Sequence, residues 1–322
     1  MAAGAVVVVG ITLWLRDPLL RAPCLRETGY FCIKVIEIDR DTAAGPTYGL
    51  VLDHLFHSQV TPLEPRWLSY SYLRVYADMT ALKAAELPDF RALMIGGGGY
   101  ALPRYLDAVY PRSEVHVVEI DPVVTEITHE LLGLDRATRI RSHNHDARIF
   151  LQAWHDAPRF DLVYGDAFND LAMPYHLTTV EFARTVHGLL NDDGVYLANV
   201  IDVYDRGAVV RAFLATIGEV FPHVYLLRWG DHRPEEIETL VVAGAKGPLD
   251  LTAFRDPAVS HRRLGRRVST TTVEGEALRE FLAAGQARIL RDDHAPIDQL
   301  TAPLFALRGD DCAAGCAQPE RR

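Results

Sequence analysis

Residues 91–121 read RALMIGGGGYALPRYLDAVYPRSEVHVVEID, and this stretch decides the fold. An apolar run at 92–95 stops at four consecutive glycines, and residues 100–109 follow with helical spacing. A second apolar run, 115–118, ends in Glu119. The order of strand, glycine turn, helix and acid-tipped strand predicts the first half of a nucleotide-binding α/β sheet.

The turn itself indicates which nucleotide-like ligand it suits. Its glycines, which let a ligand approach the main chain closely, are Gly96, Gly97, Gly98 and Gly99. Glu119, about 20 residues further on, can accept hydrogen bonds from both ribose hydroxyls. The turn does not spell G-x-G-x-x-G, because Tyr100 and Ala101 stand where later glycines would be. Since an adenosyl-sulfonium ligand has no phosphate to cradle, we expect S-adenosylmethionine or a relative rather than NAD.

Acidic residues also follow the next predicted strands. Asp146 comes after a short strand that begins at residue 140, and Asp166 follows the buried run 160–164. Ligands of such sheets bind outside the carboxyl ends of the strands. We therefore expect Glu119 to hold the ribose, Asp146 to accept from the adenine amino group, and Asp166 to lie nearest the reacting carbon.

The repeated pattern predicts an α/β fold with a Rossmann-like, S-adenosylmethionine-type sheet. This sheet is expected to be mostly parallel, with helices on both faces and a small N-terminal β-hairpin domain before it. We expect an apolar N-terminal segment, a small β-rich domain, a nucleoside-binding catalytic domain and a C-terminal extension, in that order: residues 1–24, 25–80, 81–250 and 251–322.

Several local elements can be predicted as well. Residues 30–59 alternate around a Gly/Pro break, which suggests a hairpin. The aromatic-rich stretch 67–76 is interpreted as a helix with Tyr70 on a face that reaches a pocket. Residues 224–229 and 238–245 suggest a closing antiparallel pair, and residues 308–322 a loose tail.

Composition narrows the class of protein. The 322 residues are 49% hydrophobic and 24% charged, which is typical of a globular chain. The net charge of −10 disfavours nucleic-acid binding and suits a cationic ligand. The four cysteines are most simply interpreted as free thiols, and a Cys24–Cys32 bridge in an oxidising compartment is the alternative. The uncharged segment 2–15 is a buried element, a membrane-surface anchor or the end of a transmembrane segment.

Five segments resemble motifs of the spermidine synthase (aminopropyltransferase) family. In chain order, LVLDHLFH resembles L-x-L-D-G-x-x-Q, IGGGGY resembles I-G-G-G-D-G, VEID resembles the acidic strand end, HDARIFL resembles G-D-A-x-x-F-L, and GDAFND resembles D-S-S-D-P. The likeness covers about residues 30–202. Within the family, PYHLTT and RDDHAPIDQL resemble the spermidine-synthase-like domains that bacterial membrane proteins carry after transmembrane helices.

The resemblance assigns roles to residues of this chain. It implies that Glu119 contacts the ribose and that the adenine lies against Asp146 and Ala147. Asp166 would be the base that deprotonates an attacking amine, and Tyr70 would be the tyrosine of the family's Y-H-E segment. The remaining substrate-binding positions are those of the family's strand glutamine and second acid, represented here by His57 or Gln59 and by Asn169 or Asp170.

One difference from the family's motifs distinguishes the candidate functions. The family's aspartate in the glycine turn holds the propylamine end of decarboxylated S-adenosylmethionine, and this position is Gly99 here. The simplest expectation is still aminopropyl transfer from that donor to a small-molecule amine, as in polyamine biosynthesis. A methyltransferase using intact S-adenosylmethionine is the alternative, because an aspartate would repel that donor's carboxylate. A third hypothesis is a non-catalytic nucleoside- or polyamine-sensing domain.

The same reasoning gives expectations about partners. We expect no metal and no nucleic acid, and the family implies a homodimer. The expected location is the cytoplasm, with membrane association through residues 2–15 left open.

Overall fold

Two β-sheets form the frame of the computed structural model, which describes residues 23–154, 157–230 and 235–312. The smaller sheet contains β1 (Arg26–Glu27), β2 (Cys32–Asp39), β3 (Thr47–Leu52) and β4 (Leu55–Val60). The larger contains β5 (Arg91–Ile95), β6 (Glu114–Glu119), β7 (Arg141–Asn144), β8 (Phe160–Gly165), β9 (Leu190–Val203), β10 (His223–Trp229), β11 (Ile237–Ala245) and β12 (Thr270–Val273).

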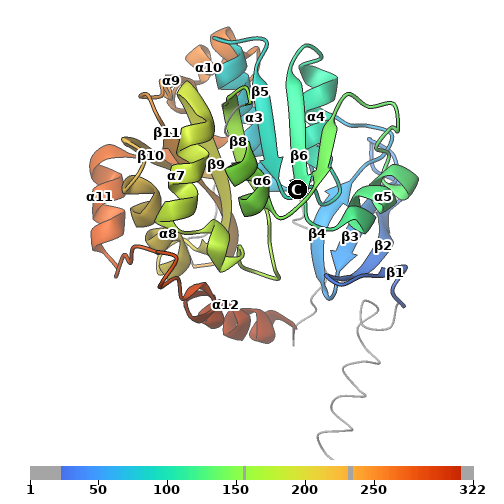
Figure 1. Cartoon of the computed structure of the whole chain (residues 1–322). Helices are drawn as coiled ribbons and strands as arrows, with labels where there is room; N and C mark the ends of the chain where they lie inside the picture. Colours follow the sequence, from blue (N-terminus) through green and yellow to red (C-terminus); the bar gives the residue numbers. More distant parts are fainter. Residues whose placement is uncertain (1–22, 155–156, 231–234, 313–322) are drawn as a thin grey trace, which may run out of the picture.

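The helices are placed between and around these strands (Figure 1). They are α3 (Ser71–Ala84), α4 (Ala101–Val109), α5 (Pro122–Leu131), α6 (Ala147–Ala153), α7 (Val180–Leu189), α8 (Ala208–Gly218), α9 (Thr252–Arg255), α10 (Pro257–Leu264), α11 (Gly275–Ala283), α12 (Ile297–Cys312) and the 3-10 helix η1 (Tyr175–Leu177).

The strand order of the larger sheet is β12-β10-β11-β9-β8-β5-β6-β7. Strands β7, β6, β5, β8 and β9 run parallel to their neighbours in this order, whereas β9, β11, β10 and β12 pair antiparallel. The predicted fold class is confirmed, including the antiparallel pair formed by β10 and β11. The parallel half carries the glycine turn and the three acidic strand ends.

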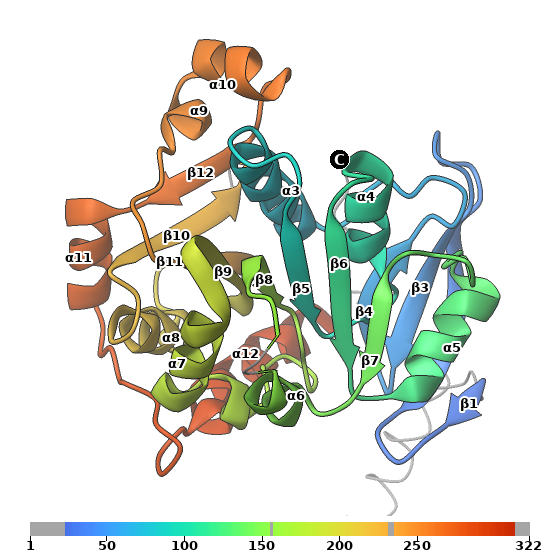
Figure 2. The same cartoon turned by 45° about the horizontal axis from the view of Figure 1, so that its top comes forward.

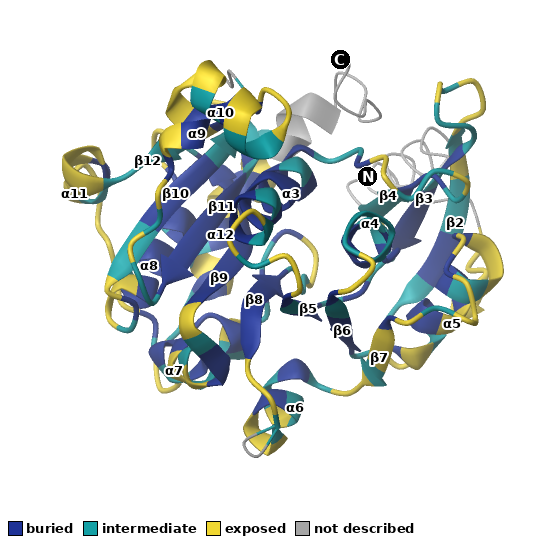
Figure 3. Cartoon of the chain, turned by 90° about the horizontal axis from the view of Figure 1, so that it is seen from above, coloured by how far each residue is buried: buried dark blue, intermediate teal, exposed yellow. Residues whose placement is uncertain are grey.

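Helices cover both faces of this sheet (Figure 2). On one face Tyr76 of α3 packs in a core with Leu162 of β8. On the other face Phe182 of α7 and Phe213 of α8 pack in a core with Val163. Successive side chains of a strand point to opposite faces, so burial on both sides explains the apolar run 162–164 of β8. Figure 3 shows the central strands β5, β6 and β8 as mostly buried, whereas the edge strand β7 is more exposed.

The N-terminal sheet contains one more turn than predicted. The stretch 48–56, expected as one strand of a hairpin, is divided into β3 and β4 by a turn at Asp53, whose φ is 56°. The Asp53 carboxylate accepts a hydrogen bond from the backbone N–H of Cys32 at 2.9 Å, which fixes this turn. The sheet packs through Leu50 and Val60 onto Ile127 of α5.

Helix α3 begins later than predicted. Residues 67–70 are not helical, and Tyr70 is the extended N-cap residue, with φ −78° and ψ 142°. The helix runs on to Ala84 because its side chains are buried on most sides. Packing against the large sheet therefore decides this helix, rather than an amphipathic pattern.

The C-terminal part is more ordered than predicted. Strand β12 pairs with β10, so the extension adds an edge strand to the large sheet. Helix α12 runs through Cys312, into the stretch expected as a loose tail. Residues 313–322 lie outside the described residues.

The structure also joins Cys24 to Cys32 by a disulfide across the β1–β2 hairpin. Thr28 in this hairpin donates a hydrogen bond to Asp121 Oδ2 at 2.7 Å, so the hairpin contacts the start of α5. None of the helices within the described ranges is long and apolar enough to cross a membrane. The apolar segment 2–15 lies outside those ranges.

Candidate active site

The structure brings the glycine turn and two of the predicted acids together at one edge of the sheet. Gly96 lies so close to the strand end at Asp166 that an added Cβ would stand 2.5 Å from the Asp166 carbonyl oxygen. Gly96 also has a φ of +91°, which a side chain rarely tolerates. On its other side the turn meets Glu119 of β6. The carboxyl ends of β5, β6 and β8, which were expected to share a ligand, are therefore contiguous.

Glu119 fixes the glycine turn by accepting hydrogen bonds from the backbone N–H groups of that turn. Its Oε2 accepts hydrogen bonds from the N–H groups of Gly97 at 2.8 Å and Gly98 at 3.1 Å. Its Oε1 accepts from the N–H of Asp121 at 3.0 Å. Burial raises the pKa of Glu119, and these three backbone bonds oppose that rise. A carboxylate offers about four acceptor sites, and these three hydrogen bonds use three of them.

Strand β4 closes the far side of the turn. Ser58 Oγ accepts a hydrogen bond from the N–H of Gly99 at 2.9 Å. A Cβ on Gly99 would lie 2.5 Å from Val60 Cγ2 and 3.0 Å from Ser58 Cβ. The position of the family's aspartate thus has neither an acid nor room for one, because the N-terminal sheet fills that space.

The two residues of β4 that the sequence singled out, His57 and Gln59, do not make this contact with Gly99. Alternation along a strand turns Ser58 and Val60 toward the glycines and leaves Gln59 on the opposite face. His57 stands at a register shift and lies beside Phe31, with ring centroids 6.2 Å apart. Ser58 could not be singled out from the residue pattern, because the direction of its side chain depends on the register shift between β3 and β4, which the sequence does not reveal.

Asp166 is held by two neutral groups. The Tyr72 hydroxyl donates to Asp166 Oδ2 at 2.8 Å, and Asn199 Nδ2 donates to Oδ1 at 3.0 Å. Burial raises the pKa of Asp166 to about 7, although both hydrogen bonds lower it. Such a carboxyl exchanges a proton near neutral pH, which suits a general base.

The two partners of Asp166 come from distant elements. Tyr72 lies in the first turn of α3, and Tyr70 stacks on it with ring centroids 5.9 Å apart and an interplanar angle of 29°. The sequence prediction singled out Tyr70, but the structure brings Tyr72 to the acid. Asn199 lies in the buried strand β9, and its Oδ1 has no hydrogen-bond partner in the described part. An amide within the apolar run 195–201 is the signal that could have pointed to it.

The adenine-side prediction falls at the start of α6. Asp146 is the N-cap, and its side chain accepts from the N–H of Ile149 at 3.0 Å. His176 Nε2 lies 3.3 Å from Asp146 Oδ2, a neighbour that the sequence did not suggest. Ala147 is buried beneath this turn.

The other predicted substrate residues lie at the tip of a turn. Asn169 forms an isolated bridge with Ala172, and Asp170 has a φ of 65°. Both side chains are exposed. Within the described ranges, no group of three or more His, Cys, Asp or Glu side chains could hold a metal ion.

Comparison with known proteins identifies the relatives of this site. Residues 79–228 match the family described as Spermine/spermidine synthase domain. The chain is 35% identical over 139 residues to a polyamine aminopropyltransferase of Vibrio vulnificus, covering 42% of this chain and 44% of that protein. It is 31% identical over 204 residues to an N-terminal histidine N-methyltransferase of Emericella nidulans, covering 57% of this chain and 35% of that protein. The chain thus spans less than half the length of these relatives.

Solved structures share the fold. A probable spermidine synthase from Corynebacterium glutamicum aligns with a TM-score of 0.68 at 24% identity, over 82% of this chain and 95% of that one. A spermidine synthase in complex with the transition state analogue AdoDATO aligns with a TM-score of 0.53 at 18% identity, over 74% and 87% of the two chains. The predicted resemblance to the spermidine synthase family is confirmed.

Tyr72→Phe should raise the pKa of Asp166 by about one pH unit, because a hydrogen bond that favours the ionised carboxylate is lost. Carboxyl titration by carbon-detected nuclear magnetic resonance of aspartate-labelled protein measures this change. Tyr70→Phe is the matched control, since Tyr70 stacks on Tyr72 while its hydroxyl donates to the Phe56 carbonyl at 3.5 Å. An equal rise in both variants would contradict the assignment of Tyr72.

Gly99→Ala should lower the free energy of unfolding by about 1–3 kcal/mol, because its Cβ would overlap Val60. Gly188→Ala is the control, since Gly188 lies in α7 with no atom within 4 Å of an added Cβ. This control should be neutral or stabilising. Urea denaturation measures both. In a double-mutant cycle, Val60→Ala should reduce the loss caused by Gly99→Ala, and simple additivity would exclude a direct clash.

Proposed function

We propose that this chain transfers an aminopropyl group from decarboxylated S-adenosylmethionine to a small-molecule amine, with Asp166 as general base. The observation that carries the proposal is the half-buried Asp166 carboxyl beside the glycine turn, with a pKa raised to about 7. The match to the spermine/spermidine synthase family supports the same reaction class.

The proposed step needs only proton removal and alignment. An amine acceptor has a pKa near 10 in water, so it arrives as an ammonium without a free lone pair. Asp166 accepts a proton from this nitrogen, and the nitrogen then attacks the carbon next to the sulfonium sulfur. The carbon–sulfur bond breaks, and methylthioadenosine leaves with the electron pair. The positive sulfur is already a good leaving group, so holding the reactants in line supplies much of the remaining catalysis.

The surrounding residues suit these roles. Tyr72 and Asn199 each donate to one oxygen of Asp166, which fixes the plane of the carboxylate. Glu119 and the glycine backbone would hold the nucleoside, and Asp146 would accept from its adenine. Burial, and then the charge of Asp166, keep the pKa of Tyr72 well above its ordinary value, so this phenol acts as a neutral donor.

Methyl transfer from intact S-adenosylmethionine is the second candidate, and one observation favours it. Gly99 stands where the family has its aspartate, so the donor tail would meet a surface without an acidic side chain at this position. That surface does not repel the carboxylate of the intact donor. The similarity to an N-methyltransferase is consistent with this alternative.

Asp166→Asn should lower turnover by about 10²- to 10⁴-fold while methylthioadenosine binds within about threefold of its original affinity. In the unchanged protein, kcat should fall as pH drops through about 7, because Asp166 must be ionised to accept a proton. Asp192→Asn is the matched control, since Asp192 is fully exposed. Turnover assays and calorimetry measure the two effects. Equal loss of binding and turnover in a folded Asp166→Asn protein would refute the role as base.

Calorimetric titration with the two donors should show tighter binding of decarboxylated S-adenosylmethionine, because Glu119 and Asp166 would repel the carboxylate that only the intact donor carries. Tighter binding of the intact donor would instead support methyl transfer. If neither donor yields product with any amine or methyl acceptor, the third hypothesis, a nucleoside- or polyamine-sensing domain, is supported instead.

A further inference from the structure

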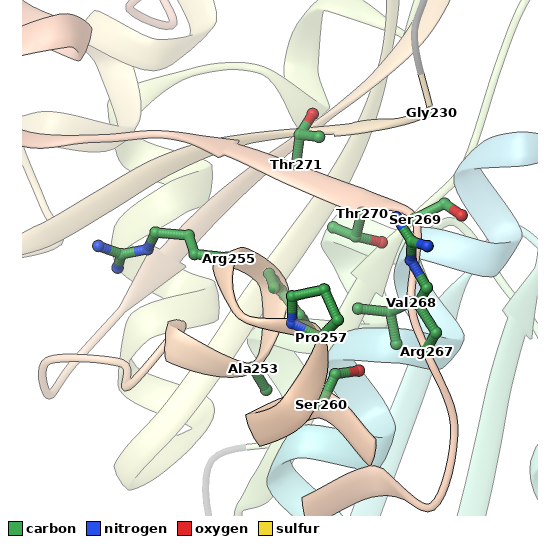
Figure 4. A pocket seen from close by; sticks show the side chains of 11 residues that line it. Gly230, Ala253, Arg255, Pro257, Ser260, Arg267, Val268, Ser269, Thr270 and Thr271 are labelled. Atoms are coloured by element: carbon green, nitrogen blue, oxygen red, sulfur yellow. The ribbon is translucent and has the colours of Figure 1, made fainter.

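A hollow lies beside β12, an edge strand of the large sheet (Figure 4). It measures about 270 Å³ and opens between helices α9 and α10 and the edge strand β12. Strands β10, β11 and β9 separate β12 from β8, so this pocket is roughly 20 Å from Asp166 in the direction across the sheet. It is therefore separate from the candidate active site.

The segment around this pocket is basic in an otherwise acidic protein. Residues 255–267 contain five arginines and a single acid, whereas the whole chain has a net charge of −10. Three of these arginines pair with carboxylates: Arg255 with Glu274, Arg263 with Asp250 and Glu86, and Arg266 with Asp78. Among the residues that the structure describes, no carboxylate pairs with Arg267.

The hydroxyl groups that line the pocket differ in whether they already donate a hydrogen bond within the protein. Ser260 Oγ already donates to the Arg266 carbonyl, and Thr270 Oγ1 to Asp78, each at 2.7 Å. The exposed hydroxyls of Ser269 and Thr271 have no side-chain partner in the described part of the chain. In Figure 4 the Arg267 side chain lies beside Ser269, while Arg255 extends away from the other lining residues.

We infer that this pocket binds a small phosphate-bearing molecule, with Arg267 as the cation that holds the phosphate. A planar guanidinium donates two parallel hydrogen bonds to a phosphate, and neighbouring hydroxyls satisfy its further oxygens. Ligand pockets usually measure about 300–1,000 Å³, so this smaller hollow suits a compact ligand. The inference is independent of the proposed transferase reaction.

The test uses the full chain and inorganic phosphate as the probe, with chloride and acetate at equal ionic strength for comparison. Calorimetry and thermal unfolding should show saturable binding of phosphate and a higher Tm than in either other salt. Arg267→Gln should weaken phosphate binding at least about tenfold, because charge-assisted hydrogen bonds are lost.

The matched control is Arg262→Gln, which removes the same charge from an exposed arginine of α10 that does not line the pocket. This variant should keep the affinity for phosphate within about twofold. Equal weakening in both variants would overturn the inference in favour of general charge attraction. Unchanged binding in Arg267→Gln would place the phosphate elsewhere, and equal stabilisation by acetate would overturn the assignment to phosphate.

Discussion

The close approach of the backbone at residues 96–99 is the constraint on which the site depends. Each glycine is required by a different neighbour. An added Cβ would lie 2.5 Å from the Asp166 carbonyl at Gly96, 2.7 Å from the Tyr100 ring at Gly97, 2.7 Å from Ser58 Oγ at Gly98, and 2.5 Å from Val60 at Gly99. Four side-chain-free positions thus let the strand ends, the following helix and the N-terminal sheet meet at one point.

The two acids at this point are held in different ways. Glu119 accepts from three backbone N–H groups, so its position follows the main chain of the turn. Asp166 accepts from the side chains of Tyr72 and Asn199, which belong to α3 and β9. Environments that differ in this way assign different chemistry to otherwise similar carboxylates. The first suits holding a neutral hydroxyl, and the second suits exchanging a proton.

The sequence is informative where local pattern and topology act together. Parallel strands end at the same edge, so the residue pattern alone predicts that the glycine turn, Glu119 and Asp166 meet. Tyr72 and Ser58 cannot be placed in this way. Their directions depend on where α3 begins and on an irregularity in β4, and tertiary packing sets both. Helix α3 is buried on most sides, so its sequence has no single apolar stripe from which a start or a facing residue could be inferred.

The contact between β4 and Gly99 has a consequence for exchanging parts between this chain and its relatives. The glycine turn belongs to one sheet and its covering residues to another, yet Val60 leaves no volume for a side chain at position 99. If the turn were transplanted from a relative with an aspartate at this position, the aspartate side chain would overlap Val60 of β4. Chimeras that keep the contact between Gly99 and β4 must therefore take the turn and β4 from the same parent, although about 40 residues separate them in the sequence.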